Sequence, residues 1–209
     1  AAPQKKKAES GAPLVFSYAG GLYSGKRDLS VLFKALRQLV DDGTLTEADL
    51  RLDYAGLDSG IMMAFAQREN LEGIVHNRGQ LTRQQAIEMQ QMADCALVCA
   101  HNTIQDKGIL TGKVYECLMI GNPILAIVNG DAPGSELGSL IRRVKAGAVY
   151  EEAANEQDFP AMKHFILQLL KQKRETGLVA WPMDEEQKNA YSYNEIAGGF
   201  QALAMGEAT

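Results

Sequence analysis

Short apolar runs separated by helical patterns are the feature that most constrains the fold of this chain. Six such runs recur, each rich in aliphatic or β-branched residues and each long enough for a buried strand. They are PLVFSYAG (13–20), LRLDYAG (50–56), EGIVHNRG (72–79), ADCALVCA (93–100), NPILAIV (122–128) and GAVY (147–150). Alternation of strand and helix predicts an α/β fold, a doubly wound Rossmann-like parallel sheet with its ligand at the carboxyl ends of the strands.

Helical patterns fill the intervals between these runs. From about Asp28 the apolar residues recur every three or four positions, which gives a helix one apolar face. Thr82 followed by Gln85 predicts a capping box at the start of another helix. The further helices are expected at about 61–70, 113–120, 135–146, 160–173 and 185–204, with the capped one over 82–93.

Composition excludes some classes of function. The 209 residues contain 46% hydrophobic residues, enough for a full core and in the size range of one domain. The 21 basic residues against 26 acidic ones lack the excess that phosphate-binding nucleic-acid proteins show. No apolar run reaches the roughly 20 residues of a membrane helix. We therefore expect neither a nucleic-acid partner nor a transmembrane segment.

The three cysteines point to a reduced protein. Cys95, Cys99 and Cys117 have no CxxC spacing, and the first two fall in an apolar strand-like run. They are expected to be free thiols in the core, which agrees with a cytoplasmic location.

A glycine-rich turn follows the first predicted strand and suits an anion. Gly20 and Gly21 let the backbone approach a ligand closely, and the following helix N-terminus adds partial positive charge. Lys26 and Arg27 add full charges. We interpret the turn as a diphosphate cradle. The alternative is an ordinary connection with two solvated cations.

The same turn has part of the P-loop spacing. Gly20 and Gly25, with four residues between them, and then Lys26 fit that motif, but Arg27 stands where a Ser or Thr hydroxyl should hold Mg²⁺. A guanidinium cannot ligate this metal, so a P-loop NTPase is the weaker hypothesis. The dehydrogenase fingerprint GxGxxG is absent from this turn.

A second polar cluster follows the fourth predicted strand. The backbone amides of Thr111 and Gly112, together with Lys113, lie at a predicted helix N-terminus and suit phosphate or sugar oxygens. Glu116 is one turn further on and can share a face with Lys113. Because a carboxylate only accepts hydrogen bonds, it can bind both hydroxyls of a vicinal diol. The alternative is a solvated ion pair on a helix surface.

Two segments resemble a known family. GILTGKVYECLMIGNPILAI (108–127) and FSYAGGLYSGKRDLSVLFKAL (16–36) are similar to the nucleotide-binding segments of retaining GT-B glycosyltransferases, the group 1 family of glycogen synthase and mannosyltransferase type. The resemblance covers most of 13–205 and implies that 13–209 form the C-terminal donor-binding domain. It also implies that the acceptor domain lies outside this sequence. The polar opening, 1–12, is expected to be a linker or remnant.

The resemblance assigns roles to individual residues. It places Glu116 on the ribose hydroxyls of the donor, and Arg78, Gly79 and Leu81 beside the base. It places Gly20, Gly21, Lys26, Arg27, Thr111, Gly112 and Lys113 around the diphosphate. Two positions depart from the family pattern. Gly108 replaces a glutamate that contacts the transferred sugar, and Gly21 replaces an arginine.

The resemblance further implies a nucleotide-sugar substrate, glycosyl transfer and neither a metal nor another cofactor. The isolated domain is expected to bind donor without transferring sugar, and any membrane association would come from the missing domain. Which residues are catalytic stays open, as do the nucleotide base and the sugar. The alternatives are a sugar-nucleotide epimerase of the same fold and a non-catalytic scaffold domain, the latter suggested by Gly108 and Gly21.

Overall fold

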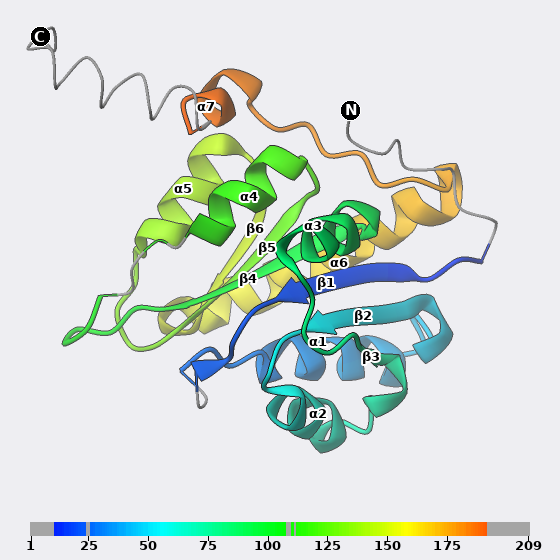
Figure 1. Cartoon of the computed structure of the whole chain (residues 1–209). Helices are drawn as coiled ribbons and strands as arrows, with labels where there is room; N and C mark the ends of the chain where they lie inside the picture. Colours follow the sequence, from blue (N-terminus) through cyan, green and yellow to red (C-terminus); the bar gives the residue numbers. More distant parts are fainter. Residues whose placement is uncertain (1–10, 24–25, 108–109, 111, 192–209) are drawn as a thin grey trace, which may run out of the picture.

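One sheet of parallel strands forms the centre of the molecule (Figure 1). The computed structural model describes residues 11–23, 26–107, 110 and 112–191. The strands are β1 (Leu14–Ala19), β2 (Leu50–Ala55), β3 (Val75–Asn77), β4 (Cys95–His101), β5 (Ile124–Asn129) and β6 (Gly147–Glu151), in the spatial order β3-β2-β1-β4-β5-β6. This is the doubly wound order with its reversal between β1 and β4, so the predicted Rossmann-like α/β fold is confirmed.

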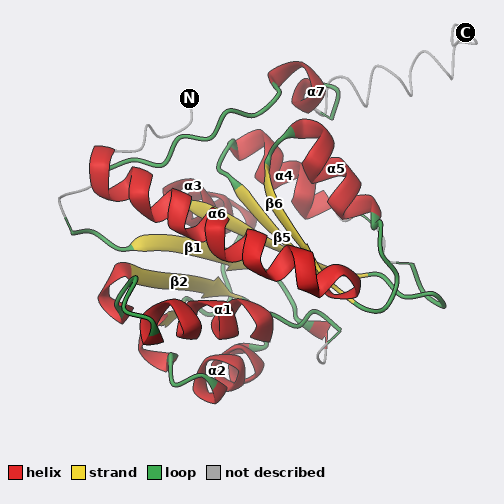
Figure 2. Ribbon diagram, turned by 180° about the vertical axis from the view of Figure 1, so that it is seen from behind, coloured by secondary structure: helices red, strands yellow, loops and turns green. Residues whose placement is uncertain are grey.

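Helices cover both faces of the sheet. Figure 2 shows α1 (Ser30–Asp41), α2 (Ser59–Arg68) and α6 (Asn155–Thr176) on one face. On the other face lie α3 (Arg83–Met92), α4 (Gly112–Ile120) and α5 (Glu136–Val144) (Figure 1). A short α7 (Glu185–Asn189) and the 3₁₀ turns η2 (Glu47–Asp49), η3 (Glu72–Ile74) and η4 (Glu152–Ala154) complete the described elements.

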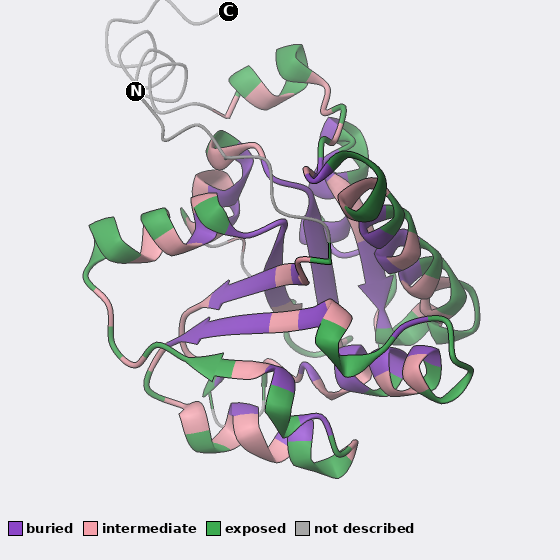
Figure 3. Cartoon of the chain, turned by 90° about the vertical axis from the view of Figure 1, so that its right-hand side faces the viewer, coloured by how far each residue is buried: buried purple, intermediate pink, exposed green. Residues whose placement is uncertain are grey.

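The core has one part on each side of the sheet, which accounts for the apolar runs in the sequence. Strand residues such as Phe16 and Leu52 pack with α1, α2 and α6, whereas Val128 and Ala126 pack with α4 and α5. Figure 3 shows the strands as largely buried apart from the edge strand β3, with exposed residues on the outer sides of the helices. Burial on both faces is what a parallel strand requires of its sequence.

Side chains fix where several elements begin. Thr82 accepts from the amide of Gln85, and the Gln85 side chain accepts from Thr82 N, so the predicted capping box of α3 is confirmed. Asn129, at the end of β5, accepts from Asp28 N (2.9 Å) and donates to Asp28 O (3.0 Å). This pair of bonds joins the chain entering α1 to a strand 101 residues away.

Some predicted boundaries differ from the structure. β3 has three residues rather than eight, because Glu72–Ile74 form a 3₁₀ turn and the strand lies at the sheet edge. α6 begins at Asn155, five residues before the expected start, and contains Pro160. Acidic residues in its first turn favour this earlier start. The predicted helix over 185–204 is described only up to residue 191, where α7 has already ended.

The three cysteines are buried and form no disulfide within the described residues, as predicted. Burial raises the pKa of the Cys117 thiol to about 12, so this thiol is a packing group rather than a nucleophile. Among the described residues, no helix has the length and apolar character needed to cross a bilayer.

Candidate functional site

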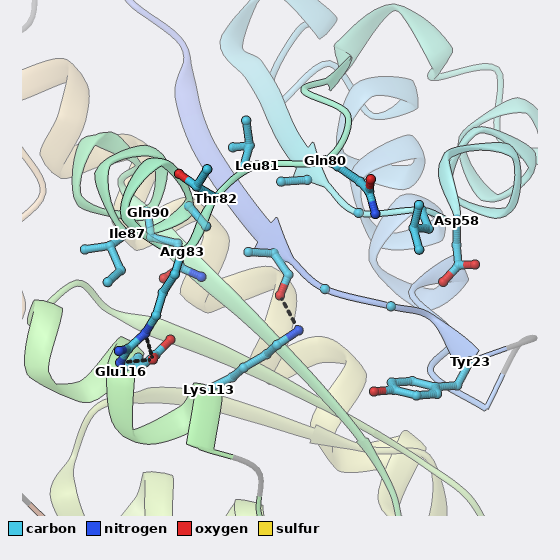
Figure 4. Close-up of a pocket in the computed structure, with 17 residues that line it drawn as sticks. Tyr23, Asp58, Gln80, Leu81, Thr82, Arg83, Ile87, Gln90, Lys113 and Glu116 are labelled. Atoms are coloured by element: carbon cyan, nitrogen blue, oxygen red, sulfur yellow. Dashed lines mark hydrogen bonds and ion pairs between the residues drawn. The ribbon is translucent and has the colours of Figure 1, made fainter. Parts of the chain in front are cut away.

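A cavity of about 900 Å³ opens at the carboxyl end of the sheet (Figure 4). Its walls are the loops that follow β1, β2 and β3, together with the facing sides of α3 and α4. This is the end of the sheet, beside the strand-order reversal, where doubly wound folds bind ligands. The cavity is lined by side chains that include Tyr23, Asp58, Gln80, Leu81, Arg83, Ile87, Gln90, Lys113 and Glu116, and by the backbone of Gly20, Gly21 and Gly56.

Two tyrosines hold the glycine turn after β1. Tyr18 Oη donates to the carbonyl of Gly21 (3.0 Å), and Tyr54 Oη donates to the carbonyl of Gly20 (3.2 Å). Desolvation raises the pKa of both hydroxyls, so both remain protonated donors. Their rings stack with centroids 6.1 Å apart. The turn is therefore fixed from the core side.

Backbone bonds decide which amide of the turn remains for a ligand. Gly20 N donates to Ala55 O (2.8 Å), and Leu22 N donates to the carboxylate of Asp58 (2.6 Å). Gly21 N donates to no group of the described residues, and Gly21 lines the cavity. The Gly21 amide is thus available to an anion, although the Asp58 carboxylate also lines this part of the wall.

Lys113 extends from α4 to the underside of the turn. Its Nζ donates to Ala19 O at 2.9 Å, and a Cβ on Gly20 would overlap that Nζ (Figure 4). Desolvation lowers the pKa of Lys113, and the nearby positive charge of Arg27 lowers it further. Gly20 has φ +146°, a value that side-chain-bearing residues rarely adopt. Glycine at this position thus makes room for the lysine.

Glu116 lies one helical turn after Lys113 and also lines the cavity. Arg83, the first residue of α3, donates to Oε1 of Glu116 from Nη2 (2.6 Å) and Nε (3.0 Å). The Glu116 side chain is 25% exposed and that of Arg83 is 68% exposed, so the pair lies at the cavity mouth. The structure therefore brings Lys113, Glu116 and the glycine turn to one cavity.

The two cationic residues of the glycine turn, Lys26 and Arg27, lie outside the cavity. Lys26 is exposed, and neither Lys26 nor Arg27 lines the cavity. The Arg27 guanidinium lies 4.4 Å from the centroid of the Tyr23 ring and donates to Gly21 O (3.4 Å). Gly112 begins α4 but does not line the cavity either. Thr111 and Gly108 are outside the described residues.

Of the three residues predicted beside the base, Leu81 lines the cavity, and the other two shape its loop. Arg78 forms an ion pair with Asp53 (2.9 Å), whose carboxylate is buried. Gly79 has φ +67° and accepts a hydrogen bond from Gly56 N (3.0 Å). A buried carboxylate needs a cationic partner, which explains the direction of Arg78.

Sequence reasoning missed the α3 side of the cavity. Arg83, Ile87 and Gln90 recur at helical spacing and face α4 across the cavity. Gln90 is only 6% exposed, and its side-chain amide makes no hydrogen bond to the described residues. The spacing i, i+4 and i+7 places the three residues on one face of α3, but Ile87 is apolar, so no polar stripe marks this wall in the sequence. Asp58 carries no such signal either.

Comparisons with known proteins give structural likeness without sequence matches. No family model matches the chain, and no curated protein sequence does. The pneumococcal O-GlcNAc transferase GtfA, solved with UDP and GlcNAc, is 12% identical with TM-score 0.61, over 97% of this chain and 37% of its own. Sucrose-phosphate synthase from Thermosynechococcus elongatus is 16% identical with TM-score 0.61, over 93% and 45%. HepE from Anabaena, solved with UDP and glucose, is 13% identical with TM-score 0.61, over 91% and 49%.

This chain spans less than half the length of each of these three proteins. Identities this low carry the fold and not the chemistry. The three matches nevertheless agree in fold, and each covers nearly all of the strands and helices described above. The chain therefore has the fold of one Rossmann-like half of a GT-B glycosyltransferase.

Proposed function

We propose that this chain is the donor-binding domain of a glycosyltransferase and that its cavity binds a nucleoside diphosphate sugar. One observation carries the proposal: Lys113 and Glu116, one turn apart on α4, line one cavity together with the glycine turn after β1. A diphosphate needs cations and amides, and a ribose needs an acceptor for its two hydroxyls. The cavity provides all of these.

Each part of the donor has a counterpart in the wall. The diphosphate would lie against Lys113 and the free amide of Gly21, with the N-terminus of α4 adding partial charge. The ribose hydroxyls would donate to Glu116, and the base would lie against Leu81 and Ile87. The structures of GtfA and HepE were each solved with UDP, which supports the same ligand class here.

The chemistry would depend on stabilising the leaving group. As the bond between sugar and diphosphate breaks, negative charge develops on the diphosphate, and a preorganised ammonium lowers the energy of that state. We propose that Lys113 has this role, in place of a divalent metal. Its desolvated position costs free energy before the ligand arrives and strengthens its interaction with phosphate afterwards.

Transfer itself would need a second domain. Rate in such enzymes comes from holding donor and acceptor together in a closed cleft, and this cavity provides only the donor side. This chain spans less than half the length of the three solved proteins of this fold compared above. We propose an acceptor domain outside these residues as the partner, and no transfer by this chain alone.

Calorimetric titration with UDP, GDP, ADP and the matching nucleosides tests the binding proposal. We expect one diphosphate to bind clearly more tightly than its nucleoside, and Lys113→Met to remove that advantage. Absence of binding by all three diphosphates would favour the scaffold alternative. Incubation with radiolabelled UDP- and GDP-sugars and an acceptor tests the second part, since turnover by this chain alone would show that its catalytic groups are complete.

A further inference from the structure

The ion pair between Arg83 and Glu116 bridges α3 and α4 at the cavity mouth. Nε and Nη2 of Arg83 both donate to the same oxygen, Oε1 of Glu116 (Figure 4). Oε2 accepts no hydrogen bond from the described residues. The carboxylate is therefore held through one oxygen while the other stays available on the cavity side of the pair.

The position of Arg83 is itself determined. It is the first residue of α3, directly after Thr82, whose capping box with Gln85 fixes where the helix begins. A donor at the first helical position does not move with fraying as long as that cap is intact. Arg83 is thus anchored by the backbone on one helix, and Glu116 is anchored on the other.

We propose that Arg83 is a positioning residue for ribose recognition. It orients the Glu116 carboxylate so that the remaining lone pairs accept the hydroxyls of the nucleotide. This inference rests on the proposed nucleotide site and adds to it a residue from α3. A free carboxylate on a helix samples several rotamers, and each must be fixed when the ligand binds, so prior orientation lowers the entropic cost of binding.

The pair also has an electrostatic consequence for the ligand. An unpaired carboxylate beside a diphosphate would repel it, whereas the Arg83–Glu116 pair carries no net charge. Loss of Arg83 should therefore weaken the binding of every nucleoside diphosphate somewhat, whether or not the ligand carries ribose hydroxyls. Only the positioning role predicts a change in how well the site distinguishes a ribose from a deoxyribose.

The test compares a nucleoside diphosphate with its 2′,3′-dideoxy analogue, using whichever of UDP, GDP and ADP binds most tightly. The wild-type chain should prefer the hydroxylated form by about tenfold or more, as expected for hydrogen bonds to a charged group. In Arg83→Gln this preference should fall below about threefold, while the thermal midpoint stays unchanged. Arg83→Ala should behave in the same way.

Arg174→Gln is the matched control, because Arg174 forms a 2.8 Å pair with Asp49 at similar exposure and away from the cavity. It should keep the full preference. An unchanged preference in Arg83→Gln, even with weaker binding overall, would overturn the positioning role. A wild-type chain that binds both forms equally would overturn it too, by removing the ribose from Glu116. A wild-type chain that binds no diphosphate would instead reject the proposed function.

Discussion

Gly20 leaves open the space into which the ammonium group of Lys113 projects. A Cβ at position 20 would overlap Nζ of Lys113, which donates to the carbonyl of the preceding residue, Ala19, at 2.9 Å. The two residues are 93 positions apart, on β1's turn and on α4. The identity of one therefore sets the position of the other.

Gly20→Ala should reduce diphosphate affinity by about tenfold or more, because the displaced Lys113 loses its place under the turn. It should also cost about 1–3 kcal/mol of stability, since alanine is strained at φ +146°. Chemical denaturation and calorimetry measure the two effects. Gly43→Ala, at φ +74° with nothing within 4 Å, is the control and should lose stability only. Equal loss of diphosphate affinity in both variants would show that the effect of Gly20→Ala does not come from displacement of Lys113.

Lys113→Met should abolish the preference for diphosphate over nucleoside and raise the thermal midpoint at neutral pH. The folded pKa of Lys113 lies below its ordinary 10.5, so between the two values the unfolded chain binds more protons than the folded chain. The stability of the wild type therefore rises with pH through that window. Below it, the cost of the buried ammonium is fully present.

Thermal unfolding across an alkaline pH series measures this effect. The midpoint difference between Lys113→Met and the wild type should shrink as pH rises through the lowered pKa. Over the same window the wild-type affinity for diphosphate should fall, because a neutral amine does not attract phosphate. A difference that stays constant with pH would mean that Lys113 remains charged at no cost.

Glu116→Ala should weaken diphosphate binding by about 1.5 to 3 kcal/mol, the range for a hydrogen bond to a charged group. The fold should persist, since the side chain lies at the cavity mouth, one-quarter exposed. Calorimetry on a variant with an unchanged midpoint is the measurement. Glu116→Gln keeps the shape of the side chain but loses its charge. Its affinity for diphosphate should lie between that of the wild type and that of Glu116→Ala. Full affinity in the alanine variant would remove Glu116 from the site.

Lys26→Ala combined with Arg27→Ala should weaken diphosphate binding by only about two- to threefold and leave nucleoside binding unchanged, because the two cations lie outside the cavity and act on phosphate through screened long-range charge. Arg27 packs on Tyr23 and binds Gly21 O, both beside the cavity. Titration of the double variant with both ligands is the check. Equal weakening of the two would mean that these residues shape the turn and do not meet phosphate.

The sheet was predictable because its causes are local. Apolar runs mark all six strands, and the capping box marks α3 at the residue where it begins. β3 was overestimated because its edge position gives it fewer neighbours and only three paired residues. Pro160 was expected to open a helix, and the acidic turn before it extends that helix instead.

The candidate site was predictable only in part. Gly20, Gly21, Lys113, Glu116 and Leu81 line the cavity and could be found from the motifs. Arg78 could not be placed, because its partner Asp53 is 25 positions away and nothing local marks that carboxylate as buried. Arg83 was missed for the same reason, since its partner lies 33 positions away on another helix. Pairings across the fold decide these side chains, and no local pattern records them.

The two hydrogen bonds between Asn129 and Asp28 also affect how early in folding the cavity can form. The glycine turn is complete in sequence by residue 27, yet its restraints come from Tyr54, Asp58 and Lys113, and the chain leaving it is held by Asn129. A chain emerging from the ribosome would carry the turn for about a hundred residues before its last restraint was made. The cavity is therefore expected to form only after β5 docks, so a ligand present during folding can act only on a chain that already contains β1 to β5.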